Sequence, residues 1–228
     1  YSPDDGQIIG FYLMATQSAT DPATAEESAI STDSGLLVPG ESDQMLYLRS
    51  MTNELMIAVD PRARLVQALQ QDEFLLFAQK ILSLKSGVPE PDCYEILLRL
   101  KEEEDNLLPP GGFIPVVERY GMLESLDRWV VRRLIAWCLD KHQSAPGWRI
   151  PLFCINLSGA SVSSPDFAEF VQHELERPDF PARALCFEIS DADVITYTDS
   201  VRRLVAALKP AGCRFSIDGF GGVGNYGG

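Results

Sequence analysis

Residues 184–189, Ala-Leu-Cys-Phe-Glu-Ile, are the stretch that decides the fold. This short apolar run, interrupted only by Glu188 near its end, is typical of a strand that is buried on both faces. Helical periodicity precedes it over residues 166–176 and follows it over residues 199–208. A strand between two helices predicts βα units, in which successive strands are parallel and are covered by helices.

The same alternation extends in both directions along the chain. Further strands are predicted at residues 74–82, 93–100, 150–157 and 214–218, and further helices at residues 61–71, 113–121 and 124–141. The later strands recur at intervals of roughly 30 residues, which is the length of one βα unit. The fold class is therefore α/β, and both a doubly wound sheet and a (β/α) barrel satisfy the pattern.

The composition excludes several classes of function. The chain has 228 residues and a net charge of −14, which argues against nucleic acid polymers and anionic membranes as main partners. No apolar run approaches the roughly 18 residues of a membrane span, and the first residues lack the regions of a signal peptide. The five cysteines show no CxxC spacing. That pattern disfavours zinc and indicates a reduced, cytoplasmic domain. Cys154, Cys186 and Cys213 each stand in a short apolar run and are predicted to be small buried hydrophobes.

The first 60 residues differ in character from the rest. Residues 7–16 predict a strand, whereas residues 17–60 predict a linker and connecting helix, because their first part is rich in small and polar residues. The strand and the turn before it resemble the last hairpin of a PAS sensory domain, which would make residues 1–16 the end of such a domain. An orphan strand is the alternative. The absence of a starting Met suggests a piece of a longer chain.

Four side chains that carry oxygen stand at or near predicted strands: Glu95, Asn156, Glu188 and Asp218. They are 61, 32 and 30 residues apart, or about two, one and one βα units. In a barrel, side chains at the carboxyl ends of the strands converge on one face. Three carboxylates and an amide oxygen suit a hard cation such as Mg²⁺ or Mn²⁺. Each residue taken alone is more often a helix cap or a turn former.

An ordered series of motifs resembles that of the EAL domain family. The stretch Glu95-Ile-Leu-Leu-Arg99 is similar to the signature that names the family, with Ile96 in place of the middle alanine. The other matching motifs are Gln79 in Phe-Ala-Gln-Lys-Ile, Phe113-Ile-Pro-Val-Val-Glu118 with Gly121, Asn156-Leu-Ser158, Glu188-Ile-Ser-Asp191 and Asp218-Gly-Phe-Gly221. Residues 61–228 are therefore identified as an EAL-like domain.

The resemblance implies a TIM-like (β/α) barrel of EAL type, incomplete in this chain. It implies binding of cyclic di-GMP and, in active members, its hydrolysis to linear pGpG with Mg²⁺ or Mn²⁺. The implied ligands of the first metal ion are Glu95, Asn156, Glu188 and Asp218. The implied nucleotide-binding residues are Gln79, Glu95, Leu97 and Arg99. A guanidinium suits this role because an acidic chain needs a local cation to bind a phosphate dianion.

The sequence departs from the family pattern after Asp218. Active members carry two consecutive aspartates there, whereas this chain has Gly219. Because a two-metal phosphodiesterase uses both ions, the missing carboxylate should weaken or abolish the second ion and leave one ion only. Asp191, the single candidate for a catalytic role, stands where the family has the longer Glu. The lysine, glutamate and glutamine of the family's later strands have no counterpart before Gly228, so we expect a longer natural protein or a fragment.

The leading hypothesis is a catalytically impaired EAL-like domain that acts as a cyclic di-GMP receptor or regulatory module. It would be attached to an upstream sensory domain and form a homodimer. One alternative is a working phosphodiesterase that tolerates Gly219. A second alternative is a scaffold that binds a protein partner and has lost nucleotide binding.

Overall fold

The computed structural model of the chain describes residues 11–14, 60–82, 92–101, 107–145 and 147–219. The strands are β1 (Phe11–Met14), β2 (Phe74–Ile81), β3 (Cys93–Lys101), β4 (Leu107–Leu108), β5 (Leu152–Leu157), β6 (Leu185–Ser190) and β7 (Arg214–Asp218). The helices are α2 (Pro61–Gln70), α3 (Pro110–Arg119), α4 (Leu123–Ser144), α5 (Gly159–Ser163), α6 (Phe167–Leu175), the 3₁₀ helix η2 (Ala182–Ala184), α7 (Asp191–Thr196) and α8 (Thr198–Leu208). Every strand and helix predicted after residue 60 is present, with ends that differ by a few residues.

The strands form one sheet in the order β1-β2-β3-β5-β6-β7, with β4 paired to β3. As predicted, β3, β5, β6 and β7 are parallel to one another. The prediction of a fully parallel sheet is wrong for β2, which is antiparallel to β3. Only residues 82–92 join these two strands, and a parallel crossover needs about a dozen residues or more, usually including a helix.

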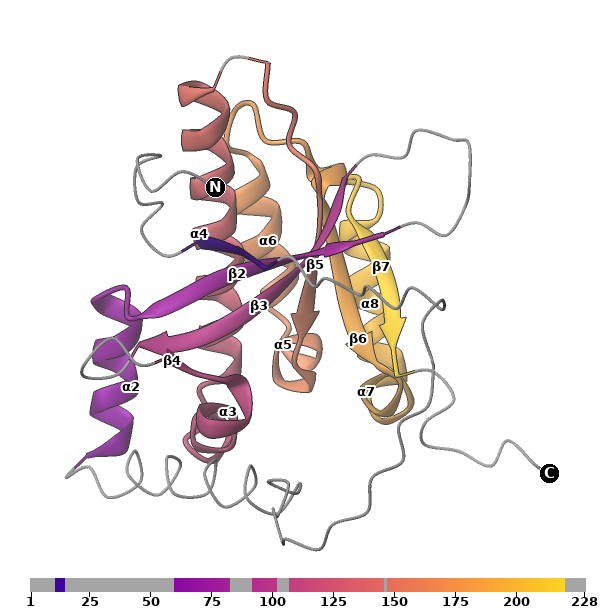
Figure 1. Ribbon diagram of the computed structural model, residues 1–228. Coiled ribbons are helices and arrows are strands. Elements are labelled where there is room, and N and C mark those ends of the chain that lie inside the picture. The colour runs from indigo at the N-terminus through magenta and orange to yellow at the C-terminus, as the bar shows by residue number, and fades with distance from the viewer. Residues whose placement is uncertain (1–10, 15–59, 83–91, 102–106, 146, 220–228) are drawn as a thin grey trace, which may run out of the picture.

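The long helices lie on one face of the sheet, where α4, α6 and α8 pack behind the parallel strands (Figure 1). The main apolar core lies between them and contains the buried rings of Phe153, Phe167 and Phe187. A second core joins α2 and α3 to the end of the sheet through Phe74 and Phe113, whose ring centroids are 5.4 Å apart. Because helices cover this outer face, the polar side chains of the strands lie on the opposite, inner face.

Two short helices that the periodicity did not predict follow directly from strands. The Ser158 hydroxyl accepts a hydrogen bond from the Ser161 N–H at 3.3 Å, which caps α5 after β5. The Ser190 hydroxyl accepts one from the Asp193 N–H at 3.0 Å, which caps α7 after β6. Helices of five and six residues carry too few turns for an apolar stripe, so only their capping serines mark them in the sequence.

The architecture is of the predicted α/β class, a curved sheet with helices on its outer face, and the described strands do not close into a barrel (Figure 1). Of the strand predicted at residues 7–16, the structure describes Phe11–Met14, which pair in parallel with β2. The rest of the PAS-like stretch and residues 17–59 of the predicted linker lie outside the described residues. Within the part of the chain that is described, no helix has the length and apolarity of a membrane span.

Candidate functional site

The four predicted metal ligands lie on the inner face of the sheet. Asn156 on β5 is the register partner of Glu188 on β6. Glu95 on β3 lies two residues toward the amino-terminal ends of the strands from this level, and Asp218 on β7 lies two residues toward the carboxyl-terminal ends. Offsets of two residues preserve the face on which a side chain lies, so all four side chains share one face in a staggered row.

Hydrogen bonds already connect members of this row. The Asn156 amide donates from Nδ2 to Oε1 of Glu95 at 3.0 Å, across the gap between β5 and β3. The Ser216 hydroxyl donates to Oε1 of Glu188 at 3.0 Å. The carboxylate of Asp218 accepts from the N–H of Gly219 at 2.8 Å. Each carboxylate is therefore held by a polar neighbour on the sheet or in the turn that follows it.

Uncompensated negative charge gathers at Glu188. Burial raises the pKa of this carboxyl, and the negative charges of Glu95 and Asp218 raise it further, against the opposing effect of the Ser216 hydrogen bond. A divalent cation would relieve this repulsion, and the oxygen-only donor set fits Mg²⁺ or Mn²⁺. The stagger keeps the carboxylates apart, however. Among the described residues, no three or more His, Cys, Asp or Glu side chains are grouped closely enough to hold a metal ion.

The predicted nucleotide-binding residues lie on the same inner face. Gln79 on β2 is the register partner of Glu95, and Leu97 and Arg99 follow at two and four residues further along β3. The Arg99 guanidinium lies over the ring of Phe77, 5.4 Å from its centroid, and donates from Nη1 to the carbonyl of Leu98 at 2.6 Å. This half-buried cation stands near the carboxyl end of β3, beyond Glu95.

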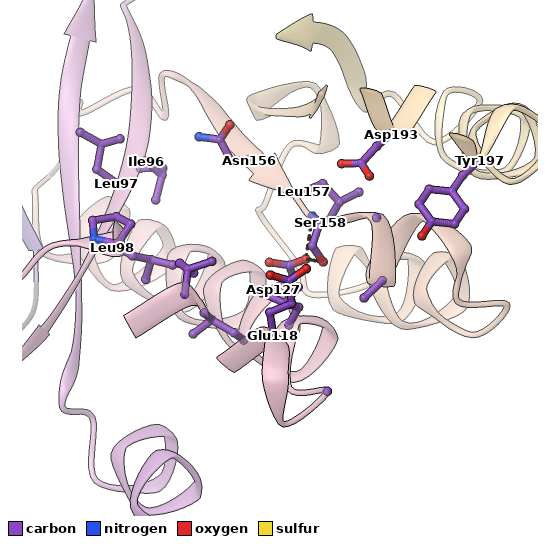
Figure 2. A pocket seen from close by; sticks show the side chains of 17 residues that line it. Ile96, Leu97, Leu98, Glu118, Asp127, Asn156, Leu157, Ser158, Asp193 and Tyr197 are labelled. Atoms are coloured by element: carbon purple, nitrogen blue, oxygen red, sulfur yellow. Dashed lines mark hydrogen bonds between the residues drawn. The ribbon is translucent and has the colours of Figure 1, made fainter. Parts of the chain in front are cut away.

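A pocket of about 620 Å³ opens where β3 and β5 separate beyond their paired residues. Leu97 and Asn156 form part of its wall on the side of the predicted site, and Glu118, Asp193 and Tyr197 line the rest of its mouth (Figure 2). The remaining wall residues come from β3, β5, α3, α4, α5 and the turns beside them, and most of them are apolar. The pocket joins the predicted ligand-binding strand to three acidic side chains, Glu118, Asp127 and Asp193. Glu118 belongs to one of the motifs found in the sequence, whereas the sequence did not connect Asp127 and Asp193 with the site.

One of these acidic side chains is the buried carboxylate of Asp127 on α4. Its Oδ2 atom accepts hydrogen bonds from the Ser158 N–H at 3.0 Å, the Ser158 hydroxyl at 2.6 Å and the Ser161 hydroxyl at 2.7 Å (Figure 2). Burial raises the pKa of Asp127, while these hydrogen bonds oppose the rise. Asp127 thus fixes the turn that follows Asn156. Sequence reasoning missed this role because the partners are about 30 residues away.

A row of thiols lies beside the predicted metal ligands. Cys93, Cys154 and Cys186 each stand two residues before Glu95, Asn156 and Glu188, and Ser216 stands two residues before Asp218. Cys93 and Cys154 have their sulfur atoms 3.8 Å apart, and the Cys186 sulfur lies 3.6 Å from the Ser216 hydroxyl. The repeated pattern of Cys-x-Glu, Cys-x-Asn, Cys-x-Glu and Ser-x-Asp was the sequence signal for this row. The prediction that Cys154, Cys186 and Cys213 are small buried residues is confirmed, although Cys154 and Cys186 lie on the inner face and only Cys213 belongs to the main apolar core.

The turn after β7 shows what Gly219 contributes. Its φ of +68° lies in the left-handed region that favours glycine, and a Cβ atom built there meets no described atom within 4 Å. Asp191, the candidate catalytic residue, is buried at the start of α7, one residue after the strand that carries Glu188. Residues 220–221 of the last predicted motif lie outside the described residues.

The fold is of the TIM-like α/β class, and acidic side chains of its strands lie on the inner face of the sheet. The sequence pattern of the EAL domain matches residues 62–224, and the chain belongs to the EAL domain family. PdeF of Escherichia coli strain K12, a cyclic di-GMP phosphodiesterase by name, is 33% identical over 182 residues, which are 79% of this chain and 23% of PdeF. PdeB of Shewanella oneidensis, a cyclic di-GMP phosphodiesterase by name, is 30% identical over 165 residues, which are 72% of this chain and 19% of PdeB. The chain thus spans less than a quarter of either relative.

Solved structures share this architecture. The EAL domain of FimX from Pseudomonas aeruginosa, solved bound to c-di-GMP, superposes with a TM-score of 0.61 at 28% identity, over 68% of this chain and 60% of that domain. The phosphodiesterase PaMucR, solved as a c-di-GMP complex, gives a TM-score of 0.56 at 26% identity, over 69% of this chain and 62% of PaMucR. The predicted EAL-type fold is confirmed, with the barrel open in the described part of this chain.

Proposed function

We propose that this domain is a cyclic di-GMP receptor or regulatory module whose phosphodiesterase activity is impaired. The observation that carries the proposal is the staggered row of Glu95, Asn156, Glu188 and Asp218 followed by Gly219, where active family members are expected to have a second aspartate. The similarity to phosphodiesterases and to domains solved with c-di-GMP supports the ligand. The retained row supports binding, and the missing carboxylate supports impairment.

The inner-face residues suit a cyclic dinucleotide. The Arg99 guanidinium is the cation nearest the predicted site on β3, and it can donate paired hydrogen bonds to a phosphate. Leu97 offers an apolar contact for a base at the wall of the pocket, while Gln79 lies level with Glu95. When bound, Mg²⁺ or Mn²⁺ supplies a Lewis acid that offsets phosphate charge and activates water. Its oxygen ligands would be Glu95, Asn156, Glu188 and Asp218, whose row has to close around it.

The rival hypothesis is a working phosphodiesterase, and a direct comparison of binding with turnover separates the two. The protein is incubated with cyclic di-GMP and Mn²⁺, pGpG is followed by chromatography, and binding is measured by calorimetry in Ca²⁺. We expect saturable binding with negligible pGpG. Turnover that depends on Mn²⁺ and saturates with substrate would refute impairment and favour the enzyme. Absence of binding with and without metal would refute both and favour the scaffold.

Restoring the missing carboxylate tests the cause of the impairment. Gly219→Asp places a second aspartate after Asp218, and there is space for the side chain. The left-handed backbone costs a non-glycine residue about 1 kcal/mol, a penalty that Asp tolerates better than most residues. We expect Mn²⁺-dependent pGpG formation to rise at least tenfold, while Gly219→Asn, which has the same shape without the charge, stays inactive. Equal activity of the two variants would contradict the missing-ligand explanation.

Two further variants test the assignment of the binding residues. We expect Arg99→Ala to weaken cyclic di-GMP binding at least tenfold, because a charged hydrogen-bond donor to a phosphate contributes about 1.5–3 kcal/mol. We expect Glu95→Gln to abolish any dependence of the affinity on divalent metal. Arg202→Ala, at an exposed position of α8 on the outer face, is the matched control. Unchanged affinity in Arg99→Ala would refute the placement of the nucleotide.

The cytoplasmic location and the homodimer stay predictions.

A further inference from the structure

The thiol row (Cys93, Cys154 and Cys186) is the feature of the inner face that the proposed function does not use. Each thiol lies on the same strand and the same face as a predicted metal ligand, two residues before it. Contacts run along the row, from the Cys93 sulfur to the Cys154 sulfur at 3.8 Å and from the Cys186 sulfur to the Ser216 hydroxyl at 3.6 Å. The other two cysteines, Cys138 and Cys213, are buried in the apolar core on the opposite face.

The thiols of the row could bind a metal ion or form a disulfide, and the structure favours the disulfide. All five cysteines are free, so the thiols of the row are reduced. A soft metal ion would need three thiols grouped around one point, and no such group exists among the described residues. Neighbouring thiols that do not hold a metal can still lose two electrons together and form a disulfide.

Register selects which pair can be joined. Cys154 and Cys186 are Cα partners on adjacent parallel strands, so their Cα atoms are about 4.8 Å apart, within the range of disulfides. Cys93 is two residues out of register with Cys154, which separates their Cα atoms by about 8 Å and requires backbone movement for a stable bond. Exposure, by contrast, favours Cys93 as the thiol that a dissolved oxidant reaches first. Cys154 and Cys186 are only 5% and 7% exposed, whereas Cys93 is half-buried.

We propose that Cys154 and Cys186 form a site of oxidative modification, at which a peroxide generates a reversible cross-strand disulfide, with Cys93 as the thiol that reacts first. Hydrogen peroxide converts the Cys93 thiol to a sulfenic acid and is itself reduced to one water. The Cys154 sulfur then attacks the Cys93 sulfur, which forms a strained disulfide and releases a second water. Finally the Cys186 sulfur attacks Cys154, and Cys93 leaves as a thiol that takes up the proton. Two thiols are oxidised and one peroxide is reduced to two waters.

Peptide mapping tests this site directly, because each cysteine lies on a different tryptic peptide when trypsin does not cut before proline. The relevant peptides are 86–99 for Cys93, 134–141 for Cys138, 150–183 for Cys154, 184–202 for Cys186 and 204–214 for Cys213. The protein is treated with hydrogen peroxide, free thiols are alkylated, and the digest is analysed by mass spectrometry. We expect one main cross-link, between peptides 150–183 and 184–202, that a dithiol reductant reverses.

Variants distinguish this route from random oxidation. We expect Cys154→Ser and Cys186→Ser each to abolish the cross-link, and Cys93→Ser to slow its formation at least fivefold without changing the product. Cys213→Ser, a buried cysteine on the other face, is the matched control and should leave the rate unchanged. Circular dichroism checks that each serine variant is folded, and alanine variants at the same positions are used where a serine variant misfolds. Cross-links among all cysteines at similar rates, or sulfinic acids without any cross-link, would overturn the proposal.

The disulfide should also weaken cyclic di-GMP binding, an expectation that rests on the proposed function. The bridge would lie two residues before Asn156 and Glu188, which are themselves register partners, so a change in strand separation there reaches both. We expect oxidised protein to bind cyclic di-GMP at least fivefold more weakly than reduced protein, with no such difference in Cys154→Ser. A cross-link that leaves the affinity unchanged overturns this consequence alone. A cross-link in a protein that never binds cyclic di-GMP overturns the proposed function and leaves the modification site intact.

Discussion

Removing the Asp127 carboxylate should destabilise the domain and loosen the turn after Asn156. In Asp127→Ala, the Ser158 N–H and the Ser161 hydroxyl lose their acceptor inside the protein. The N–H cannot reorient, and Ser161 is fully buried, so each unsatisfied donor costs about 1–3 kcal/mol. The Ser158 hydroxyl is half-buried and can reach water, so it adds little.

The loss is partly offset because the variant no longer buries a carboxylate, whose raised pKa shows that its ionised form is disfavoured there. The net loss should be about 3 kcal/mol in the free energy of unfolding. Urea denaturation followed by circular dichroism measures it. Asp140→Ala, an exposed aspartate on the same helix, is the matched control and should change stability by less than about 0.5 kcal/mol. A loss below about 1 kcal/mol in Asp127→Ala would refute the reasoning, because the serine donors would then have found other partners.

Three further outcomes follow from the structure. Because the folded-state pKa of Asp127 is raised, its protonation stabilises the fold below the unfolded pKa of about 4, and this contribution disappears as the pH rises through the folded value. In urea titrations from pH 4 to about pH 7, this part of the loss of stability with rising pH should therefore be present in wild type and absent in Asp127→Asn, which does not titrate at this position. Gly112→Ala should cost about 1–3 kcal/mol in thermal or urea unfolding, since its Cβ would collide with the buried Leu108 side chain, whereas Gly111→Ala at the exposed neighbour should not. Glu174→Ala should cost only about 1 kcal/mol, because its partners Arg132 and Arg177 are exposed enough to be hydrated; a loss near that of Asp127→Ala would contradict this.

The sequence alone was sufficient where the signal is local or repeats along the chain. Apolar runs such as residues 184–189 predict strands because a strand covered on both faces must be apolar, and the helices between them follow from their 3.6-residue period. The candidate metal ligands stand out in the sequence because one such oxygen-bearing residue occurs on each of four strands. Asn156, Glu188 and Asp218 lie near the carboxyl ends of their strands, whereas Glu95 lies near the amino end of β3. An ordered series of motifs then pointed to the EAL family, to which the chain belongs.

Tertiary structure decided what depends on register and on contacts between distant residues. The antiparallel direction of β2 and the two-residue stagger of Glu95 and Asp218 around the Asn156–Glu188 pair are properties of strand pairing, which no single run encodes. The same pairing sets the thiols of Cys154 and Cys186 side by side, and packing brings Asp127 to the turn at Ser158. Periodicity specifies the face on which a side chain lies, whereas its neighbours across strands are fixed only when the sheet has formed.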